Sequence, residues 1–335
     1  MLYSVSSYTA VREHGDAAFF LKKQAFASVL GIAALLVLTQ IDYRIFKNLA
    51  ALAYLVSIVL CTVVIFSGSN INGSSRWLYV GGVSVQPSEI AKVGVIIFLA
   101  AVISKRTSAL GTTMNIIKIF IMMLPIMAVV SYTNLSTGLI IGGIAFIMLF
   151  VASSNKLAFI GITGVGVVFV WLFINMAGYR SERIAIWQNP EEYEKGYQTL
   201  QGLYAIGSGG LFGKGLGGSM QSRFVPEAQN DMIFSVVCEE LGIFGAICII
   251  LLYIMLLWRF MVVAANAKDL FGSYLVVGIM AHIALQVSLN IAVVTNTIPN
   301  TGITLPFFSY GGTSIAILLA EMGLVLSVSR GIELT

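Results

Sequence analysis

Residues 242–258, GIFGAICIILLYIMLLW, form an uncharged apolar run that ends at Arg259. A helix needs about 20 such residues to cross a bilayer. Counting this one, the chain has nine apolar runs, near 24–40, 49–67, 88–104, 115–132, 137–153, 157–176, 232–258, 271–298 and 305–329. The runs are continuous rather than alternating, which excludes a transmembrane β-barrel. The sequence therefore predicts an all-α polytopic membrane protein with about nine transmembrane helices.

The composition of the chain agrees with this prediction. Of 335 residues, 58% are hydrophobic and only 10% are charged, against roughly a quarter charged in soluble domains. A soluble domain and a disordered chain are both excluded. The net charge of +4 does not suggest a nucleic-acid partner. Only two histidines are present, and the three cysteines have no CxxC spacing, so we predict neither a zinc site nor a disulfide.

Lysine and arginine mark alternate connections, which the positive-inside rule places in the cytoplasm. These connections are 41–48, 105–114 and 259–270. The longest polar connection, 177–231, then lies outside the cell, before the last three helices. No linker divides the chain, so we treat 1–335 as a single membrane domain.

The first group of candidate site residues runs from Gln86 to Lys92 (QPSEIAK). Pro87 is suited to the first turn of a helix, and Glu89 and Lys92 share a face three residues apart. A charge inside a span costs about 2.5–3.5 kcal/mol on insertion scales. Two interpretations stay open: an ion pair at the start of a helix, or a cavity that holds an anionic group, with Lys92 and Arg76 as cations.

The second group is the glycine-rich stretch 205–218, AIGSGGLFGKGLGG. It contains GxGxxG, but no strand precedes it, so the match to a dinucleotide site is weak. We expect no nucleotide and a flexible re-entrant loop. Its backbone N–H groups could still approach a phosphate, with Lys214 beside them.

The third group, PEAQND, leads from Pro226 into an apolar run. We expect Pro226 to open a helix that places Glu227 and Asp231 one turn apart on one face. Two carboxylates there could bind a divalent cation (Mg²⁺ or Mn²⁺), or one could act as a general base. Acidic residues also compensate a helix dipole, which explains Glu227 better than the deeper Asp231.

The fourth group is the Pro- and Gly-interrupted stretch 296–314, which includes Ser309 and Tyr310. Irregular backbone at membrane depth must be buried in protein or line a cavity. A cavity wall is the interpretation we favour over an ordinary hairpin. Glu321, deeper in the same apolar run, needs a partner such as Lys92 or a polar backbone, and the sequence does not decide which.

These groups, in this order, resemble the SEDS family of FtsW, RodA and SpoVE. The specific pieces are Arg76-Trp77, Gln86–Lys92, the R..RI..W..P pattern from Arg180 to Pro190, Gly196–Gln198, the glycine-rich loop, Pro226–Asp231, Glu239–Gly242 and LPF.SYGG.S. The family has ten membrane helices, and residues 2–8 resemble the end of the first one. By this resemblance, the first helix is largely absent here.

The resemblance implies a peptidoglycan glycosyltransferase of the bacterial cytoplasmic membrane, closest to the FtsW and SpoVE branch. The family's essential loop aspartate falls on Asp231, the expected catalytic residue and, with Glu227, the possible metal ligand. The positions expected to bind substrate are Arg76, Trp77, Gln86, Ser88, Glu89, Lys92, Arg183, Lys214, Glu227, Ser309 and Tyr310. In one departure, Asn134 stands where many members have an acidic residue.

The implied substrate is lipid II, and the implied partners are a class B penicillin-binding transpeptidase and proteins of division, elongation or sporulation. Lipid II has a lipid tail in the bilayer and a polar head at its outer surface, which suits a polytopic protein with one long outer loop. Transfer from an α-linked pyrophosphate to a β-linked glycan inverts the anomeric carbon, so one displacement suffices. That step needs a base, such as Asp231, and cations for the leaving pyrophosphate.

Two other function classes stay open. A flippase that transports the same lipid would use intramembrane Glu89, Lys92 and Glu321. A scaffold would only recruit the transpeptidase, although it needs no carboxylate pair. The resemblance favours the enzyme. We expect Glu89 and Lys92 to face an internal cavity together with Trp77 and Asp231.

Overall fold

The computed structural model describes residues 1–71, 74–80, 83–164, 166 and 178–332. Within these ranges, eight helices are long and apolar enough to cross a membrane, namely α2 (Phe19–Gln40), α3 (Arg44–Ser67), α4 (Pro87–Lys105), α5 (Thr113–Thr133), α6 (Leu135–Ala152), α10 (Ile233–Ala265), α11 (Leu270–Val294) and α12 (Gly312–Arg330). They match eight of the nine predicted runs. The ninth, 157–176, is helical over 157–164, and most of its remainder lies outside the described residues.

Shorter elements complete the described chain. They are α1 (Leu2–His14), η1 (Thr107–Gly111), α8 (Gly178–Gln188), η2 (Pro190–Glu192), η3 (Glu194–Gly196), α9 (Tyr197–Ser208) and η4 (Gln221–Arg223). Five of these, α8, η2, η3, α9 and η4, fall in the long polar connection, which is therefore largely folded. The multi-pass helical architecture agrees with the predicted fold class.

The chain forms two compact units, each assembled from segments far apart in sequence. The first unit comprises residues 1–25, 159–254 and 286–311. The second comprises residues 26–158, 255–285 and 312–335. Helices α2, α10 and α11 each contribute residues to both units.

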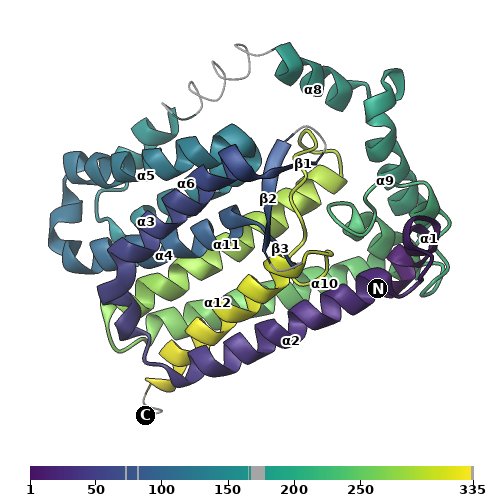
Figure 1. The fold of residues 1–335 in the computed structure, drawn as a ribbon. Coiled ribbons are helices and arrows are strands. Elements are labelled where there is room, and N and C mark those ends of the chain that lie inside the picture. Colours follow the sequence, from purple (N-terminus) through teal and green to yellow (C-terminus); the bar gives the residue numbers. More distant parts are fainter. Residues whose placement is uncertain (72–73, 81–82, 165, 167–177, 333–335) are drawn as a thin grey trace. The chain divides into compact units, whose positions relative to one another are not determined.

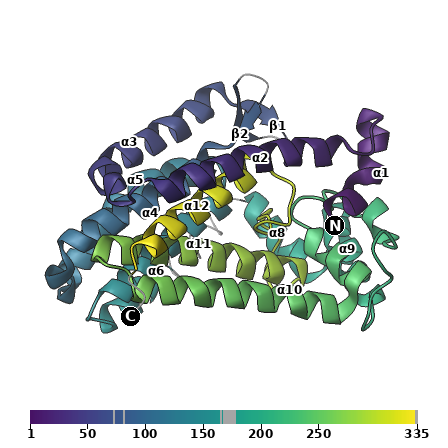
Figure 2. The ribbon, with the colours of Figure 1, turned by 90° about the horizontal axis from the view of Figure 1, so that it is seen from below.

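In the second unit, α4 is the most buried of the long helices, with apolar residues on every side. Gly94 lets α3 approach it, since a Cβ there would lie 2.2 Å from Ser57 Oγ. Figure 1 shows α3 to α6 packed as neighbours. Helices α2 and α12 run side by side (Figure 2) and meet at Gly31 and Gly323, where a Cβ would come within 2.6 Å and 2.7 Å of the opposite helix.

A small antiparallel sheet between α3 and α4 was not predicted. Its strands are β1 (Ser69–Ile71), β2 (Ser74–Val80) and β3 (Val83–Val85), in the order β1-β2-β3. Pairs such as Asn70↔Ser75 and Tyr79↔Ser84 set the register. Strand β2 carries Arg76 and Trp77, whose side chains alternate between its two faces.

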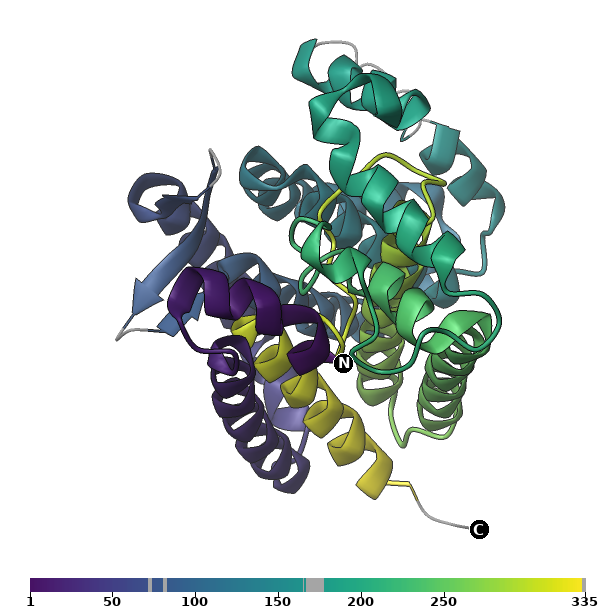
Figure 3. The ribbon, with the colours of Figure 1, turned by 90° about the vertical axis from the view of Figure 1, so that its right-hand side faces the viewer.

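In the first unit, α8 and α9 lie beside the irregular segment 295–311 that follows α11 (Figure 3). The Trp187 indole donates to the Asn296 carbonyl at 2.9 Å, and the Tyr253 hydroxyl donates to the Pro306 carbonyl. Segment 305–311 is not helical, and α12 begins at Gly312. The predicted start of the last span at 305 is therefore wrong, because Pro306 and the positive φ of Phe307 (65°) interrupt the backbone.

Candidate functional site

Asp231 lies at the end of the long polar connection, two residues before α10, and only 8% of its surface is exposed. Its backbone carbonyl accepts a hydrogen bond from Asn290 Nδ2 at 2.7 Å, and the same amide donates to the Ile303 carbonyl at 2.7 Å. Asn290 is itself fully buried in α11. One side chain thus fastens the aspartate segment to the irregular segment after α11.

The expected helix from Pro226 does not form. Residues 226–232 are a series of turns, and Glu227 has a left-handed φ of 54°. The carbonyls that would continue such a helix are taken by other segments: that of Gln229 by Tyr310 N–H at 2.8 Å, and that of Asn230 by the Ser309 hydroxyl at 2.5 Å.

As a result, Glu227 and Asp231 are not equivalent members of one helical face. Glu227 is exposed and accepts a hydrogen bond from Asn230 Nδ2, whereas Asp231 is buried. The helix-dipole explanation of Glu227 is therefore wrong, because α10 begins only at Ile233.

The carboxylate of Asp231 is held by a short relay of side-chain amides. Gln198 Nε2 donates to Asp231 Oδ1 at 3.2 Å, and Asn300 Nδ2 donates to Gln198 Oε1 at 3.0 Å. Gly302 has a φ of +66°, and a Cβ there would lie 3.9 Å from Asp231 Oδ2. The Oδ2 atom of Asp231 thus lies near the backbone of Gly302, which has no side chain to cover it.

Burial, together with the nearby Glu227 charge and against the hydrogen bond from Gln198, raises the pKa of Asp231 to about 7. A carboxyl with a pKa near the working pH can accept a proton and release it again. Asp231 therefore has the electrostatics expected of a general base.

The glycine-rich loop is not the flexible segment that we expected. Helix α10 is broken at Gly242 (φ 69°, ψ −171°), and the loop binds both sides of the break. Lys214 and Gly215 N–H donate to the Glu239 and Glu240 carbonyls, each at 2.9 Å. Ile243 N–H donates in turn to the Gly210 carbonyl at 3.0 Å. These hydrogen bonds replace those that the helix loses at the break.

Glu239 is the buried centre of this loop, with no exposed surface. It receives Lys214 Nζ at 2.7 Å and backbone N–H groups of Met220 and Gln221, each at 3.2 Å. The hydroxyl of Ser219 also donates to it. Glu239 is thus a buried ion-pair member, and the Lys214 ammonium already has a carboxylate partner.

The other candidates of the first unit lie near the Asp231 segment. Arg183 is exposed and donates from Nη1 to the Asn300 carbonyl at 3.5 Å. Ser309 is buried, and its hydroxyl also accepts from Leu305 N–H at 2.7 Å. The ring of Tyr310 meets that of Phe20 edge to face at 4.9 Å. Ser309 is thus buried in protein and fastens the turn at 226–232, while its predicted role in binding substrate stays untested.

In the second unit, the predicted Glu89–Lys92 pair is present. Lys92 Nζ lies 2.8 Å from Glu89 Oε1, and both side chains are buried, at 1% and 8% exposure. Gln86 is the N-cap residue of α4, and its N–H donates to Thr313 Oγ1 at 3.3 Å. Ser88, in the first turn, is buried as well.

Arg76, a candidate of this unit, and Asn134, which was not one, both have structural partners. Arg76 Nε donates to the Thr133 carbonyl at 3.0 Å and so satisfies an acceptor at the end of α5. Asn134, the departure from the family pattern, caps α6 by accepting from Thr137 N–H. Neutral asparagine is a good N-cap, so this position does not need its acid for folding.

A second buried pair joins α11 to α12. His282 Nδ1 lies 2.9 Å from Glu321 Oε1, and neither side chain is exposed. This pair identifies the partner that Glu321 lacked in the sequence. Its signal was overlooked: His282, Gln286 and Asn290 recur every four residues on one face of an otherwise apolar helix.

The predicted site residues are divided between the two units. Asp231, Glu227, Arg183, Lys214, Ser309 and Tyr310 belong to the first, and Arg76, Trp77, Gln86, Ser88, Glu89 and Lys92 belong to the second. The shared cavity of Glu89, Lys92, Trp77 and Asp231 stays a prediction.

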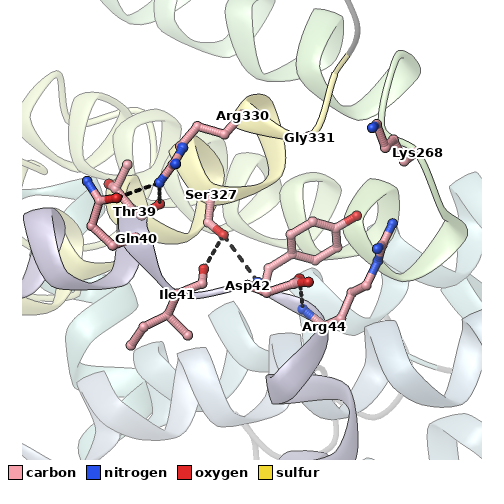
Figure 4. Close-up of a pocket in the computed structure, with 10 residues that line it drawn as sticks. Thr39, Gln40, Ile41, Asp42, Arg44, Lys268, Ser327, Arg330 and Gly331 are labelled. Carbon is pink, nitrogen blue, oxygen red and sulfur yellow. Dashed lines mark hydrogen bonds between the residues drawn. The ribbon is translucent and has the colours of Figure 1, made fainter.

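A cavity of about 280 Å³ lies in the second unit, where α2 passes into α3 and near the end of α12 (Figure 4). Arg44, Lys268 and Arg330 line it together with Asp42. Arg44 Nε is held by Asp269 at 2.9 Å, and Arg330 donates to the Thr39 carbonyl at 3.0 Å. No predicted site residue lines this cavity, which belongs to connections predicted to be cytoplasmic.

The chain is similar along its whole length to known proteins. The family described as "Cell cycle protein", which groups FtsW, RodA and SpoVE, matches residues 1–333. Stage V sporulation protein E of Bacillus subtilis is 39% identical, over 98% of this chain and 92% of that protein. A probable peptidoglycan glycosyltransferase FtsW of Trichlorobacter lovleyi is 36% identical, over 100% of this chain and 90% of that protein.

Solved structures agree with the sequence relatives. One similar chain comes from a structure described as "Structural coordination of polymerization and crosslinking by a peptidoglycan synthase complex". Its TM-score is 0.81, with 26% sequence identity, and the match covers 98% of this chain and 94% of that chain. The rod shape determining protein RodA of Thermus thermophilus has a TM-score of 0.69, with 26% identity, over 100% and 95%. This chain belongs to the FtsW, RodA and SpoVE family of multi-pass membrane proteins.

Proposed function

We propose that this chain is a peptidoglycan glycosyltransferase that polymerises lipid II into glycan strands at the outer face of the bacterial cytoplasmic membrane. The names of its relatives, a peptidoglycan glycosyltransferase and a sporulation protein, support a role in division or sporulation. The observation that carries the proposal is Asp231: a buried carboxylate with a pKa of about 7, fastened from separate segments of the chain.

In this mechanism, Asp231 accepts the proton of the acceptor sugar hydroxyl as that oxygen attacks the anomeric carbon. The bond to the pyrophosphate breaks in the same displacement, which inverts the configuration. Gln198 and Asn300 orient the carboxylate through hydrogen bonds, so that little reorganisation is needed during the reaction.

The leaving pyrophosphate needs positive charge. Among the predicted cations, Lys92 and Lys214 form ion pairs with Glu89 and Glu239. Arg183 is exposed and contacts the Asn300 carbonyl, in the segment that contacts Asp231 through Gln198. Its position supports a role for Arg183 in binding the pyrophosphate.

The alternative role for Asp231, in place of general base, is to hold a divalent cation. Asp231 and Glu227 are the carboxylates that would hold it, and within the described ranges no group of three or more His, Cys, Asp or Glu side chains surrounds a metal position. Mg²⁺ often takes one or two carboxylates and completes its shell with water and substrate phosphates. Such an ion would neutralise charge on the pyrophosphate.

We also propose a class B penicillin-binding transpeptidase as the partner of this chain. The similarity to a chain of a complex that coordinates polymerization and crosslinking supports this proposal. Division or sporulation proteins would bring the pair to its place of action.

The deciding experiment is polymerisation of labelled lipid II in detergent by the purified chain together with its transpeptidase partner. Asp231→Asn keeps the size of the side chain but cannot accept the proton. We expect the rate to fall at least ~10²-fold, as is typical when a general base is lost. Glu227→Gln, an exposed neighbour, serves as the matched control and should lose less.

The result also separates the enzyme from a flippase. The buried Glu89–Lys92 and His282–Glu321 pairs are the features that favour transport, since intramembrane charges often mark transport pathways. In detergent no lipid has to be translocated. If the chain were only a flippase, the polymerisation rate in this assay would therefore not depend on Asp231. A well-folded Asp231→Asn protein that polymerises at the wild-type rate would refute the enzyme proposal.

A further inference from the structure

The glycine-rich loop, residues 209–218, exposes large apolar side chains, and its lysine is paired with a buried carboxylate. Leu211, Phe212 and Leu216 are 66%, 80% and 70% exposed. Lys214, whose side chain is 33% exposed, directs its ammonium to fully buried Glu239. In water, large apolar side chains are normally covered and lysine is normally solvated.

The loop has a defined position along α10. Its backbone is hydrogen-bonded to Glu239 and Glu240 before the break at Gly242, and to Ile243 and Phe244 after it, at 2.9–3.1 Å. The loop therefore lies at the same level along α10 as the break.

The part of α10 after the break has the features of a lipid-facing helix. Ile243, Phe244 and Ile247 are 53%, 64% and 50% exposed. At a rise of 1.5 Å per residue, the segment 243–265 is about 34 Å long. The hydrocarbon core of a bilayer is ~30 Å thick. If this segment spans the core, the break and the loop lie at its boundary.

The exposed side chains of the loop continue this lipid-facing surface. The rings of Phe212 and Phe244 have centroids 6.5 Å apart. Because Lys214 is neutralised by Glu239, no free charge from that side chain opposes contact with hydrocarbon.

We propose that Leu211, Phe212 and Leu216 insert among the acyl chains of the adjacent phospholipid leaflet, so that the glycine-rich loop anchors the long connection to the membrane surface. By the distribution of lysine and arginine, this is the outer leaflet. The loop is then a lipid-contacting element rather than a phosphate cradle.

The test places a nitroxide label on single cysteines in the full chain, without a partner, in nanodiscs of phosphatidylethanolamine and phosphatidylglycerol. Cys61, Cys238 and Cys248 are first replaced by alanine. Phe212→Cys and Leu216→Cys are the test variants. Phe244→Cys reports lipid, and Glu192→Cys, an exposed position of the same connection, reports water. Collision rates with oxygen and with a water-soluble nickel chelate give the depth of each label.

We expect the labels at 212 and 216 to resemble that at 244, with high oxygen access and nickel access at least fivefold below that at 192. Nickel access equal to that at 192 would overturn the proposal. Shielding from both reagents would also overturn it, since that result means cover by protein. The two positions are independent, so a variant that fails to fold leaves the other to decide.

Discussion

Asp231 is buried, its carboxylate accepts a hydrogen bond from Gln198, and it is the proposed general base. Ionising its carboxyl group costs free energy in the folded chain because the group is buried, which is why its pKa rises to about 7. A carboxyl with a raised pKa contributes stability at low pH that is lost as the pH rises through the folded value. Asp231→Asn should therefore leave Tm unchanged or higher at pH 8, so that lost activity in this variant reports chemistry rather than unfolding.

The first prediction at the residue scale concerns pH. If Asp231 is the base, the polymerisation rate should rise with pH and level off above an apparent pKa near 7. Glu227→Gln removes a like charge that raises this pKa, so the acid limb should move to lower pH. Rates measured from pH 5.5 to 8.5 check both statements. An acid limb at the same pH in Glu227→Gln as in the wild type would contradict the assignment of Asp231 as the base.

Gln198→Ala should have the opposite effect. The hydrogen bond from Gln198 favours the ionised carboxylate, so its loss raises the pKa of Asp231. We expect an acid limb shifted upward by up to about one pH unit, which corresponds to about 1.4 kcal/mol. Lipid II titrations at pH 8.5 would show whether the rate recovers there, as expected for a positioning residue. Persistent loss at every pH would mean that Gln198 acts on the fold.

At the scale of elements, the broken helix α10 explains the glycines around it. Gly242 has a positive φ, and a Cβ there would lie 2.4 Å from both Gly213 N and the Leu211 carbonyl oxygen. Helix and loop can therefore join only if this position lacks a side chain. The glycine-rich motif is thus a packing device, which sequence periodicity alone does not reveal.

Gly242→Ala should loosen the loop. The backbone conformation of Gly242 (φ 69°, ψ −171°) is essentially confined to glycine and costs another residue roughly 1–3 kcal/mol, before any clash is counted. We expect hydrogen exchange of the amides at 213–215 to accelerate at least ~10-fold, as local opening becomes easier. Gly207→Ala is the control, since a Cβ there meets nothing within 4 Å. Equal protection of these amides from exchange in the two variants would contradict a role for Gly242 in holding the loop against α10.

At the scale of the whole molecule, membrane topology is the main prediction. Residue 192 should be external, and residue 268 cytoplasmic. Single cysteines at Glu192 and Lys268 should react with a membrane-impermeant maleimide from opposite sides in spheroplasts and in inverted vesicles. Labelling of both from one side would contradict the orientation.

The sequence by itself determined the spans, because a length of uncharged apolar chain has few alternatives to a helix in lipid. It also predicted the Glu89–Lys92 ion pair, since charges three residues apart on a helix share a face. The catalytic role of Asp231, which the family resemblance implies, stays a prediction. The small sheet at 69–85 was overlooked, because its short strands lie in a polar connection without a clear period.

Only the tertiary structure decided which groups become hydrogen-bond or ion-pair partners. Asn290, Ser309 and Tyr310 take the carbonyls that a helix from Pro226 would need, so the turn at 226–232 is set by distant segments. Glu321 finds His282 in the same way. Hydrogen-bond partners far apart along the chain have no local periodicity, and they become neighbours only when packing brings their segments together.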